Sequence, residues 1–358
     1  MDILVLFSGK SKGLINDAII LNDYIHILSR HVDSKVNVEL LSVDSIPNDH
    51  RYNPEDESFF YPEKNIKPDL VIHIQNIYKN NNASFEKAIN VLVPNPEWTN
   101  RLTATRARDI DQIWHKTKYS KMVFSEVLNE LTHIEHFYLG FSTIDKNKRV
   151  KNFNSFSHFR GPGTTRSTEK IVSLWMRRTD FPLLRLKFQS SDPSIHFLQL
   201  LKWFRSKNIE IKYGFVSDEE YFQDLTDSGG IQLCTSEMEG FGHYINEARM
   251  IGAVPIITNG PPMNELIDKN SGFLIEPSRI VQRSLGWRHI ISEENLEKTI
   301  EIIIKEPLSS LIEKGRNARI RYELDLDNFV ANLNLILEFN RRKIYSRQTD
   351  SAKELRKL

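Results

Sequence analysis

The sequence contains one cysteine, almost no excess charge and no long apolar run, and each of these absences excludes a class of protein. Cys234 alone can form neither an internal disulfide nor a cysteine-based zinc site, and it is typical of a reducing compartment. The 48 Lys and Arg residues balance 47 Asp and Glu residues, so no overall field attracts nucleic acid. No apolar stretch approaches the roughly 20 residues that a membrane-spanning helix needs.

The segment 1–13 also lacks the features of a secretory signal. It has a short apolar run, but neither a basic region before it nor a small-residue cleavage site after it. We therefore expect a buried first strand and a cytoplasmic protein.

Short apolar runs alternate with longer helical patterns along the chain, which is typical of parallel sheets covered by helices. The predicted strands are 3–7, 36–43, 70–74, 91–93, 110–114, 136–139, 153–159, 183–188, 209–215, 231–234, 254–258 and 273–275. The predicted helices of the second half are 167–178, 193–207, 218–227 and 242–251. The sequence thus predicts an α/β fold with two doubly wound, Rossmann-like domains that face each other across a cleft.

The chain of 358 residues, at about 150 residues per domain, is long enough for two domains. The Lys-rich stretch 145–151 lacks periodicity, so we expect an N-terminal domain over 1–150 and a C-terminal domain over 151–325. A helical pattern at 326–341 could return to the N-terminal domain, and a basic tail follows at 342–358. We interpret the tail as a solvated, frayed end; a weak contact with a membrane surface or a partner is the alternative.

The segment 234–262 carries the most chemistry. A predicted strand ends at Cys234, a turn contains Gly240 and Gly242, and a helix runs from there until Gly252 stops it. The first turn of a helix has unpaired amides and the positive end of the helix dipole, and glycines let an anion approach the backbone. This unit predicts a phosphate site.

Two carboxylates frame this turn. Glu239 precedes it, and Glu247 lies about two helical turns along, an offset on the order of 10 Å. A nucleoside diphosphate sugar laid across the helix start would place its sugar near Glu239 and its ribose diol near Glu247, since a carboxylate accepts two hydroxyl hydrogen bonds. The alternative is an ordinary capping acid and a solvated helix residue.

These residues resemble the signature of glycosyltransferase family 4, the retaining nucleotide-sugar glycosyltransferases of GT-B fold. The resemblance rests on Glu239-Gly240-Phe241-Gly242, Glu247-Ala248, Gly252 and Pro255-Ile256. The sequence departs from the family at His243, a place usually apolar there, and at 261–265, where many members have a Gly-Gly pair ahead of a Glu.

The resemblance implies a hexosyltransferase that moves a sugar from a nucleoside diphosphate donor to the hydroxyl of a glycan-type acceptor, without a metal or other cofactor. It implies that Glu239 contacts the donor sugar, that the Phe241 and Gly242 amides contact the diphosphate, and that Glu247 binds the ribose. It also implies a front-face displacement in which the leaving diphosphate helps accept the acceptor proton.

The turn after the strand 153–159 is the place where this family has basic residues that neutralise the diphosphate. Arg160 and Arg166 are the candidates here, because a guanidinium fork matches phosphate oxygens, and the spacing does not say which of the two faces the phosphate. A plain surface turn is the alternative. Further donor-binding candidates in the turn are Gly161, Thr164 and Thr165.

In the first half of the chain, loops that follow predicted strands supply candidate acceptor or donor-sugar contacts. Asn95, Glu97 and Trp98 lie on a proline-stiffened segment after one strand, and Lys116 follows another. The alternatives are a rigid corner with Trp98 packed in the core, and a solvated loop around Lys116.

Gly9 and Gly13, after the first predicted strand, resemble the glycine loop that approaches the donor in this family. Their spacing departs from G-x-G-x-x-G, which argues against a dinucleotide-binding oxidoreductase.

We expect no metal site. Asp109 and Asp111 form a D-x-D triplet, but the triplet enters a predicted strand and no other carboxylate cluster supports it. His133 and His136 have no convincing set of companion ligands.

Two other functions remain open on the sequence alone. One is a nucleotide-sugar epimerase or hydrolase of the same architecture, and the other is a non-catalytic protein that binds nucleotides or glycans. The intact pair of Glu239 and Glu247 argues against the non-catalytic alternative.

Overall fold

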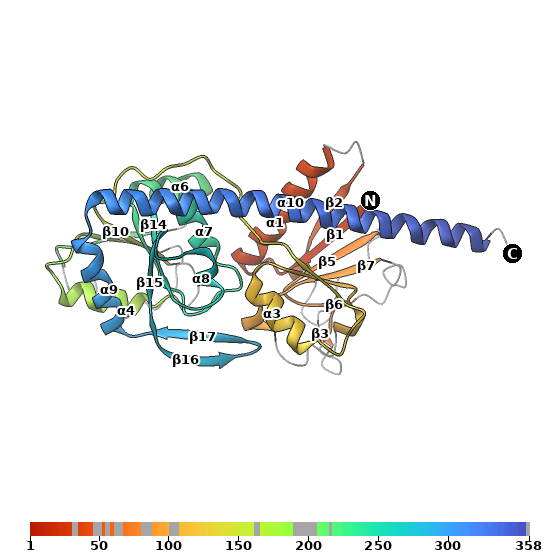
Figure 1. Ribbon diagram of the computed structural model, residues 1–358, viewed down its shortest axis with the longest axis horizontal. Coiled ribbons are helices and arrows are strands. Elements are labelled where there is room, and N and C mark those ends of the chain that lie inside the picture. The colour runs from red at the N-terminus through yellow and green to blue at the C-terminus, as the bar shows by residue number, and fades with distance from the viewer. Residues whose placement is uncertain are drawn as a thin grey trace. The chain divides into compact units, whose positions relative to one another are not determined.

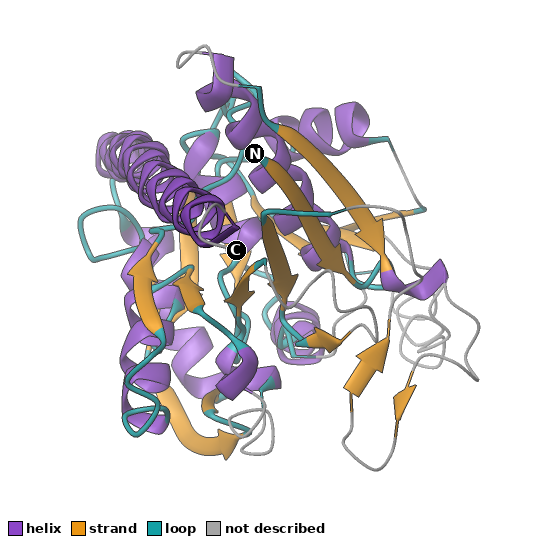
Figure 2. Ribbon diagram, turned by 90° about the vertical axis from the view of Figure 1, so that its right-hand side faces the viewer, coloured by secondary structure: helices purple, strands orange, loops and turns teal. Residues whose placement is uncertain are grey.

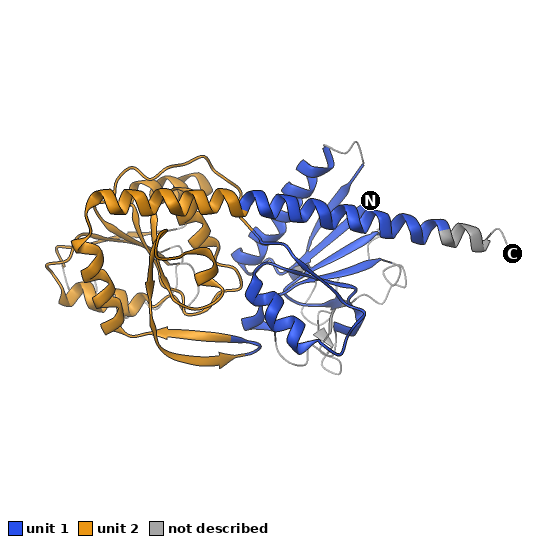
Figure 3. Cartoon of the chain, viewed as in Figure 1, with its two compact units in different colours: residues 1–141, 284–286, 326–358 blue, residues 142–283, 287–325 orange. Residues whose placement is uncertain are grey.

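The computed structural model describes residues 1–30, 35–45, 52–53, 58–60, 67–79, 88–99, 107–160, 165–188, 206–214 and 217–355. The chain divides into two compact units (Figure 3). Unit 1 comprises Met1–Phe141, Ser284–Gly286 and Leu326–Leu358. Unit 2 comprises Ser142–Arg283 and Trp287–Asp325. The first division thus falls at Phe141, where the sequence predicted a boundary near residue 150.

Unit 1 contains a parallel six-stranded sheet in the order β2-β1-β5-β7-β8-β9 (Figure 1). Its strands are β1 (Asp2–Phe7), β2 (Asn37–Ser42), β5 (Leu70–Ile74), β7 (Ile89–Val93), β8 (Gln112–His115) and β9 (Glu135–Tyr138). All five residues of β5 are buried, as expected for a parallel strand covered on both faces.

Unit 1 also contains the helices α1 (Lys12–Arg30) and α3 (Lys118–Val127) and residues 326–355 of the helix α10 (Leu308–Leu355). Short 3₁₀ turns lie at Val43–Ser45, Pro96–Trp98 and Ala107–Asp109, and β3 (Tyr52–Asn53), β4 (Ser58–Phe60) and β6 (Tyr78–Lys79) form a small sheet.

Unit 2 contains a second parallel sheet, in the order β12-β11-β10-β13-β14-β15. Its strands are β10 (Phe156–Arg160), β11 (Leu184–Phe188), β12 (Ile209–Tyr213), β13 (Ile231–Cys234), β14 (Val254–Thr258) and β15 (Phe273–Ile275). Its described helices are α4 (Thr168–Arg177), α6 (Asp218–Asp227), α7 (His243–Met250), α8 (Met263–Leu266), α9 (Glu293–Lys305) and the first part of α10, residues 308–325. Figure 2 shows helices beside the strands of both sheets, so the predicted α/β class is confirmed.

The order of the strands in unit 2 reverses between β10 and β13. From β10 the chain builds outward through β11 and β12, and it then returns to pair β13 with the other side of β10. Ligands of open α/β sheets bind outside the carboxyl ends of the strands at such a switch point. This rule directs attention to the loops that follow Arg160 and Cys234.

The hairpin after β15 and the last helix differ from the sequence predictions. A hairpin, β16 (Pro277–Arg283) and β17 (Gly286–Ile291), follows β15 and was not predicted. The predicted helix 326–341 is one part of α10 (Leu308–Leu355), so the tail expected to fray is helical as far as Leu355. Neither proline nor glycine occurs after Gly315 in α10, and nothing local interrupts the helix.

Other predictions agree with the structure to within a few residues, and the strands at 231–234, 254–258 and 273–275 and the helix at 218–227 agree at both ends. The predicted helix 193–207 lies almost wholly outside the described residues. Over the part of the chain that is described, no helix combines the length and the apolar character needed to cross a bilayer.

Candidate functional site

The loop 235–242 joins the carboxyl end of β13 to the first turn of α7. Gly242, which precedes α7, has a φ of +97°, a left-handed conformation that a residue with a Cβ rarely adopts. A Cβ there would also meet Ile245 Cδ1 at 3.1 Å. The Gly242 carbonyl accepts the amides of Ile245 and Asn246, which begins the hydrogen-bond ladder of the helix. The sequence therefore folds into the glycine turn and helix start that an anion site requires.

Glu239 is held in the loop immediately before this turn. The Ser236 hydroxyl donates to Glu239 Oε1 at 2.6 Å, and the Ser236 amide donates to the Tyr244 hydroxyl oxygen at 2.9 Å. Tyr244 is itself in the first turn of α7, so one short loop ties the carboxylate to the helix start. Burial and the charge of Glu239 together raise the pKa of Tyr244 well above its usual value, so its hydroxyl stays protonated.

Arg166 lies against the same turn. Its guanidinium carbon is 4.2 Å from the centre of the Tyr244 ring, and its Nη1 donates to the Phe159 carbonyl at 2.8 Å. Within the described residues, its Nε and Nη2 have no acceptor. Burial opposes the guanidinium charge, but Tyr244, Glu239 and Tyr221 outweigh it and raise the pKa of Arg166. A cation with donors to spare therefore lies beside the first turn of α7, where the anion site is predicted.

Arg160, the other basic candidate, has a different environment. It is the last residue of β10 and is buried, with its Nη1 4.0 Å from Glu169 and its guanidinium 5.9 Å from the centre of the Phe188 ring. Thr165 is described, and its carbonyl accepts the Glu237 amide at 2.8 Å. The candidates Gly161 and Thr164 lie outside the described residues.

Glu247 is half-buried on α7 and has a partner that the sequence did not reveal. The Tyr221 hydroxyl, on α6, donates to Glu247 Oε2 at 2.7 Å. Burial, followed by the charge of Glu247, raises the pKa of Tyr221 well above its usual value, so the hydroxyl stays a donor. The two residues are 26 positions apart, so no local pattern indicates their contact.

Glu237, two residues before Glu239, forms an ion-pair cluster that was also missed. Its side chain is only 4% exposed, and it accepts from Lys170 Nζ at 3.1 Å and from Arg288 Nε at 2.6 Å. Ser167 Oγ donates to the same carboxylate at 3.2 Å. These contacts tie the loop before α7 to α4 and to β17.

His158, within β10, connects two neighbouring elements through hydrogen bonds. Its Nδ1 lies 2.8 Å from the Leu233 carbonyl and must donate to it, so Nε2 accepts from the Thr168 hydroxyl at 2.9 Å. Burial is the main reason that the pKa of His158 is lowered to about 4; the charges of Arg166 and Arg160 act in the same direction, and the bond to the Leu233 carbonyl acts against it. A neutral imidazole thus joins β13 to the start of α4.

The acceptor candidates on the segment 95–98 belong to unit 1. Asn95 is buried, and its Nδ2 donates to Gln75 Oε1 at 3.1 Å. Glu97 is buried as well, whereas the side chain of Trp98 is 54% exposed. The exposure of Trp98 is inconsistent with the alternative in which this ring packs in the core.

Lys116 and the glycine loop also belong to unit 1. Lys116 Nζ lies 2.7 Å from Asp17 Oδ2 in an ion pair that is almost fully buried. At Gly9 a Cβ would lie 2.6 Å from Ser42 Oγ, so a side chain there would have to displace this hydroxyl of β2. Gly13 is in the first turn of α1.

The residues considered as metal ligands have other partners. Asp111 Oδ2 accepts the Asn90 amide at 2.8 Å, His133 Nε2 lies 3.1 Å from the Arg108 carbonyl, and His136 Nδ1 lies 2.9 Å from Nε2 of the buried His115. Asp109 ends the 3₁₀ turn Ala107–Asp109. Across the described parts of the chain, no group of three or more His, Cys, Asp and Glu side chains is placed to hold a metal ion.

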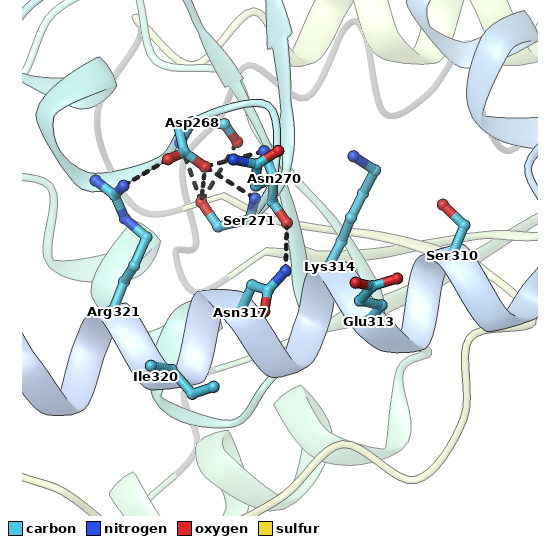
Figure 4. Close-up of a pocket in the computed structure, with 9 residues that line it drawn as sticks. All are labelled: Asp268, Asn270, Ser271, Ser310, Glu313, Lys314, Asn317, Ile320 and Arg321. Carbon is cyan, nitrogen blue, oxygen red and sulfur yellow. Dashed lines mark hydrogen bonds and ion pairs between the residues drawn. The ribbon is translucent and has the colours of Figure 1, made fainter.

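A pocket of about 490 Å³ lies elsewhere in unit 2, between the loop 268–271 and α10 (Figure 4). Asp268 in this pocket accepts from Arg321 Nη1 at 2.6 Å and from Ser271 Oγ at 2.9 Å. None of the site residues predicted from the sequence lines it. Lys314, also in its lining, donates to the Lys269 carbonyl. We place the candidate site at α7, where the residues predicted from the sequence lie.

Comparison with solved structures shows the fold. HepE from Anabaena, in complex with UDP and glucose, matches 96% of this chain and 100% of its own, at 13% identity and a TM-score of 0.61. Sucrose-phosphate synthase from Thermosynechococcus elongatus matches 97% of this chain and 100% of its own, at 12% identity and a TM-score of 0.64. The pneumococcal O-GlcNAc transferase GtfA, in complex with UDP and GlcNAc, matches 77% of this chain and 57% of its own, at 14% identity and a TM-score of 0.56.

These neighbours are GT-B glycosyltransferases, and the two parallel six-stranded sheets of this chain have the same fold. No protein-family model matches the sequence, and no curated protein matches it.

Proposed function

We propose that this protein is a retaining glycosyltransferase that moves a hexose from a nucleoside diphosphate sugar to an acceptor hydroxyl of a glycan or other glycoconjugate. The observation that carries the proposal is the grouping of Glu239, Arg166 and Glu247 around the start of α7, at the switch point of the sheet. The complexes of HepE with UDP-glucose and of GtfA with UDP and GlcNAc support a donor of this class.

In this proposal the α7 amides and Arg166 bind the diphosphate. As the bond to the sugar lengthens, negative charge develops on the leaving phosphate, and donors already aimed at it stabilise that charge without reorganisation. The acceptor hydroxyl attacks the anomeric carbon from the face on which the diphosphate leaves, and its proton passes to a phosphate oxygen. Configuration is therefore retained.

The two glutamates serve different parts of the donor. Glu239, beside the helix start, contacts the sugar, whose anomeric carbon gains positive character in the transition state. Glu247, further along α7, accepts the hydroxyls of the ribose. The guanidinium and the helix dipole supply the positive charge, so we propose that the reaction needs neither a metal nor another cofactor.

For the acceptor we propose contacts with Trp98, Asn95 and Glu97 of unit 1. Trp98 has the exposure for such a contact, and its indole offers an aromatic face on which a sugar ring can stack.

A ligand screen followed by turnover tests the proposal. UDP, GDP and ADP are first compared by thermal shift, because a ligand at 100 times its Kd adds about 2.7 kcal/mol of stability. The sugar donor of the base that binds is then incubated with glycan acceptors, with and without EDTA, and the anomeric configuration of the product is read by NMR. We expect transfer with retention in both buffers.

Other outcomes separate the alternatives. Release of free sugar at the same rate with and without acceptor indicates a hydrolase, and a changed sugar on the nucleotide indicates an epimerase. Binding without turnover indicates a non-catalytic protein. Absence of binding to all three nucleotides contradicts the proposal.

A further inference from the structure

The contact between Tyr221 and Glu247 joins two helices across the site. Tyr221 is on α6 and Glu247 on α7, and the 2.7 Å bond runs from the phenol hydroxyl to Glu247 Oε2. An ionised carboxylate can only accept hydrogen bonds, and a phenol donates one. The direction of the bond is therefore determined: Tyr221 donates and Glu247 accepts.

The Tyr221 ring is held in place by its neighbours. The Phe159 ring meets it edge to face, with centroids 5.6 Å apart and an interplanar angle of 83°. The Phe222 ring meets it in the same way at 5.2 Å. Because these contacts restrict the tyrosine rotamer, the hydroxyl stays at Oε2 with little further loss of side-chain entropy.

The bond leaves most of the carboxylate available. The two oxygens of a carboxylate have about four acceptor positions, and Tyr221 uses one of them. Within the described residues, Glu247 has no other hydrogen-bond donor, and its side chain is partly exposed. Oε1 and the remaining positions on Oε2 can therefore accept the two hydroxyls of a diol.

We propose that Tyr221 is a positioning residue, which holds the Glu247 carboxylate in the orientation that accepts the ribose diol of the nucleoside diphosphate. The inference rests on the proposed function, and it adds a residue that the resemblance to the glycosyltransferase family does not supply. Without the phenol hydroxyl, the carboxylate rotates freely about its last side-chain bonds. Binding of the diol must then order the carboxylate, and this entropic cost lowers the affinity.

The test compares a ligand that has the diol with one that lacks it. The Kd values of UDP and of 2′,3′-dideoxy-UDP are measured for the parent, Tyr221→Phe, Glu247→Gln and the double variant. Tyr221→Phe keeps the ring and its packing and removes only the hydroxyl. Tyr213→Phe is the matched control, since Tyr213 is 45% exposed on β12 and its ring stacks on Phe188.

We expect the parent to prefer UDP over dideoxy-UDP by about tenfold or more, the worth of hydrogen bonds to a charged group. Tyr221→Phe should reduce this preference by about threefold to fivefold, with the Kd of dideoxy-UDP unchanged within twofold. It should also raise KM for the donor and leave kcat unchanged, because the ribose is remote from the reacting bond. Tyr213→Phe should behave like the parent.

Several results overturn the inference. If Tyr221→Phe prefers UDP over dideoxy-UDP as strongly as the parent does, the inference is wrong and the proposed function is unaffected. Equal loss of affinity for both ligands indicates a merely structural role. If the two single variants act additively in the double variant, Tyr221 does not act through Glu247, and this result counts even where Tyr221→Phe is less stable. If the parent binds GDP or ADP instead of UDP, the same comparison is made with that nucleotide and its dideoxy form; if it binds none of the three, the proposed donor and the inference fail together.

Discussion

The guanidinium carbon of Arg166 lies 4.2 Å from the centre of the Tyr244 ring, so the first turn of α7 holds a cation where its own dipole is positive. The guanidinium and the positive end of the helix dipole repel each other, and an anion between them or a π system against the guanidinium offsets this repulsion. Tyr244 supplies the π system here, and Glu239 supplies a nearby negative charge. The arrangement is suited to a ligand with two adjacent negative groups, as in a diphosphate.

Removal of the Arg166 side chain should weaken nucleotide binding. We expect Arg166→Ala to lower UDP affinity by about 1.5–3 kcal/mol, the worth of a charge-assisted contact. Arg166→Lys should recover only part of this, since an ammonium lacks the planar fork and stacks poorly on Tyr244. Isothermal titration calorimetry measures both.

Two arginines serve as comparisons in that experiment. Arg160→Ala should cost less than Arg166→Ala, because Arg160 lies beside Glu169 and Phe188 rather than α7. Arg185→Ala, which removes the pair with Glu210 on β11 and β12, should bind UDP like the parent. UDP binding by Arg166→Ala at the parent's affinity would place the phosphate elsewhere.

The two glutamates of the motif should fail in different ways. Glu247→Gln weakens contacts with the ribose, which are alike in ground and transition states, so KM should rise and kcat should change little. Glu239→Gln affects the sugar during bond breaking, so kcat should fall while free UDP still binds. Steady-state kinetics and UDP titration distinguish the two. Equal loss of UDP affinity in both variants would contradict the assigned roles.

The cluster around Glu237 should contribute to stability. Glu237→Gln removes the charge that Lys170 and Arg288 share, but these cations are 32% and 43% exposed and water can replace part of the loss. We expect Glu237→Gln to lower the free energy of unfolding by about 1–2 kcal/mol. Each kcal/mol corresponds to a fall of roughly 2–4 °C in the thermal midpoint.

Glu294→Gln is the matched control for the cluster. Glu294 pairs with Lys298 on the exposed surface of α9, and its replacement should leave the midpoint unchanged. A fall of the same size in both variants would show that burial of Glu237 is irrelevant to its contribution.

Acid should destabilise unit 2 through His158. Its pKa is about 4 in the folded protein against about 6.5 when unfolded, so the unfolded chain binds the proton first as the pH falls. The associated stability is present above pH 6.5 and is lost between pH 6.5 and 4, by about 1.4 kcal/mol per pH unit. His158→Gln should be less stable at pH 7 but less sensitive to acid. Urea unfolding at pH 7 and pH 5 checks this, with the exposed His133→Gln as control.

Much of unit 2 follows from local pattern. The strands β13, β14 and β15 are short apolar runs bounded by glycine or polar residues, and their predicted ends agree with the structure. Strand β10 was predicted to start three residues early, because Phe153 is apolar yet packs against the core from outside the sheet. The hairpin of β16 and β17 was missed because only three of its thirteen strand residues are buried, so no alternation is visible.

Helix α10 shows how packing overrides local signals. Its first turns contain Gly315 and many charged residues, and the sequence predicted no helix there. The structure buries Ala318 and Tyr322 from this stretch and pairs Arg319 with Asp145, so contacts with the rest of unit 2 stabilise turns that have weak propensity of their own.

The sequence by itself determined the glycine turn, the start of α7 and the two carboxylates that frame it, because these lie within nine consecutive residues and depend on local backbone geometry. Only the tertiary structure decided that Arg166 rather than Arg160 lies against α7, that Tyr221 holds Glu247, and that Glu237 joins α4 to β17. Each of these contacts joins residues from different elements. The order of strands brings such elements to one edge of the sheet, and that order results from the burial of the whole apolar surface, which no local pattern encodes.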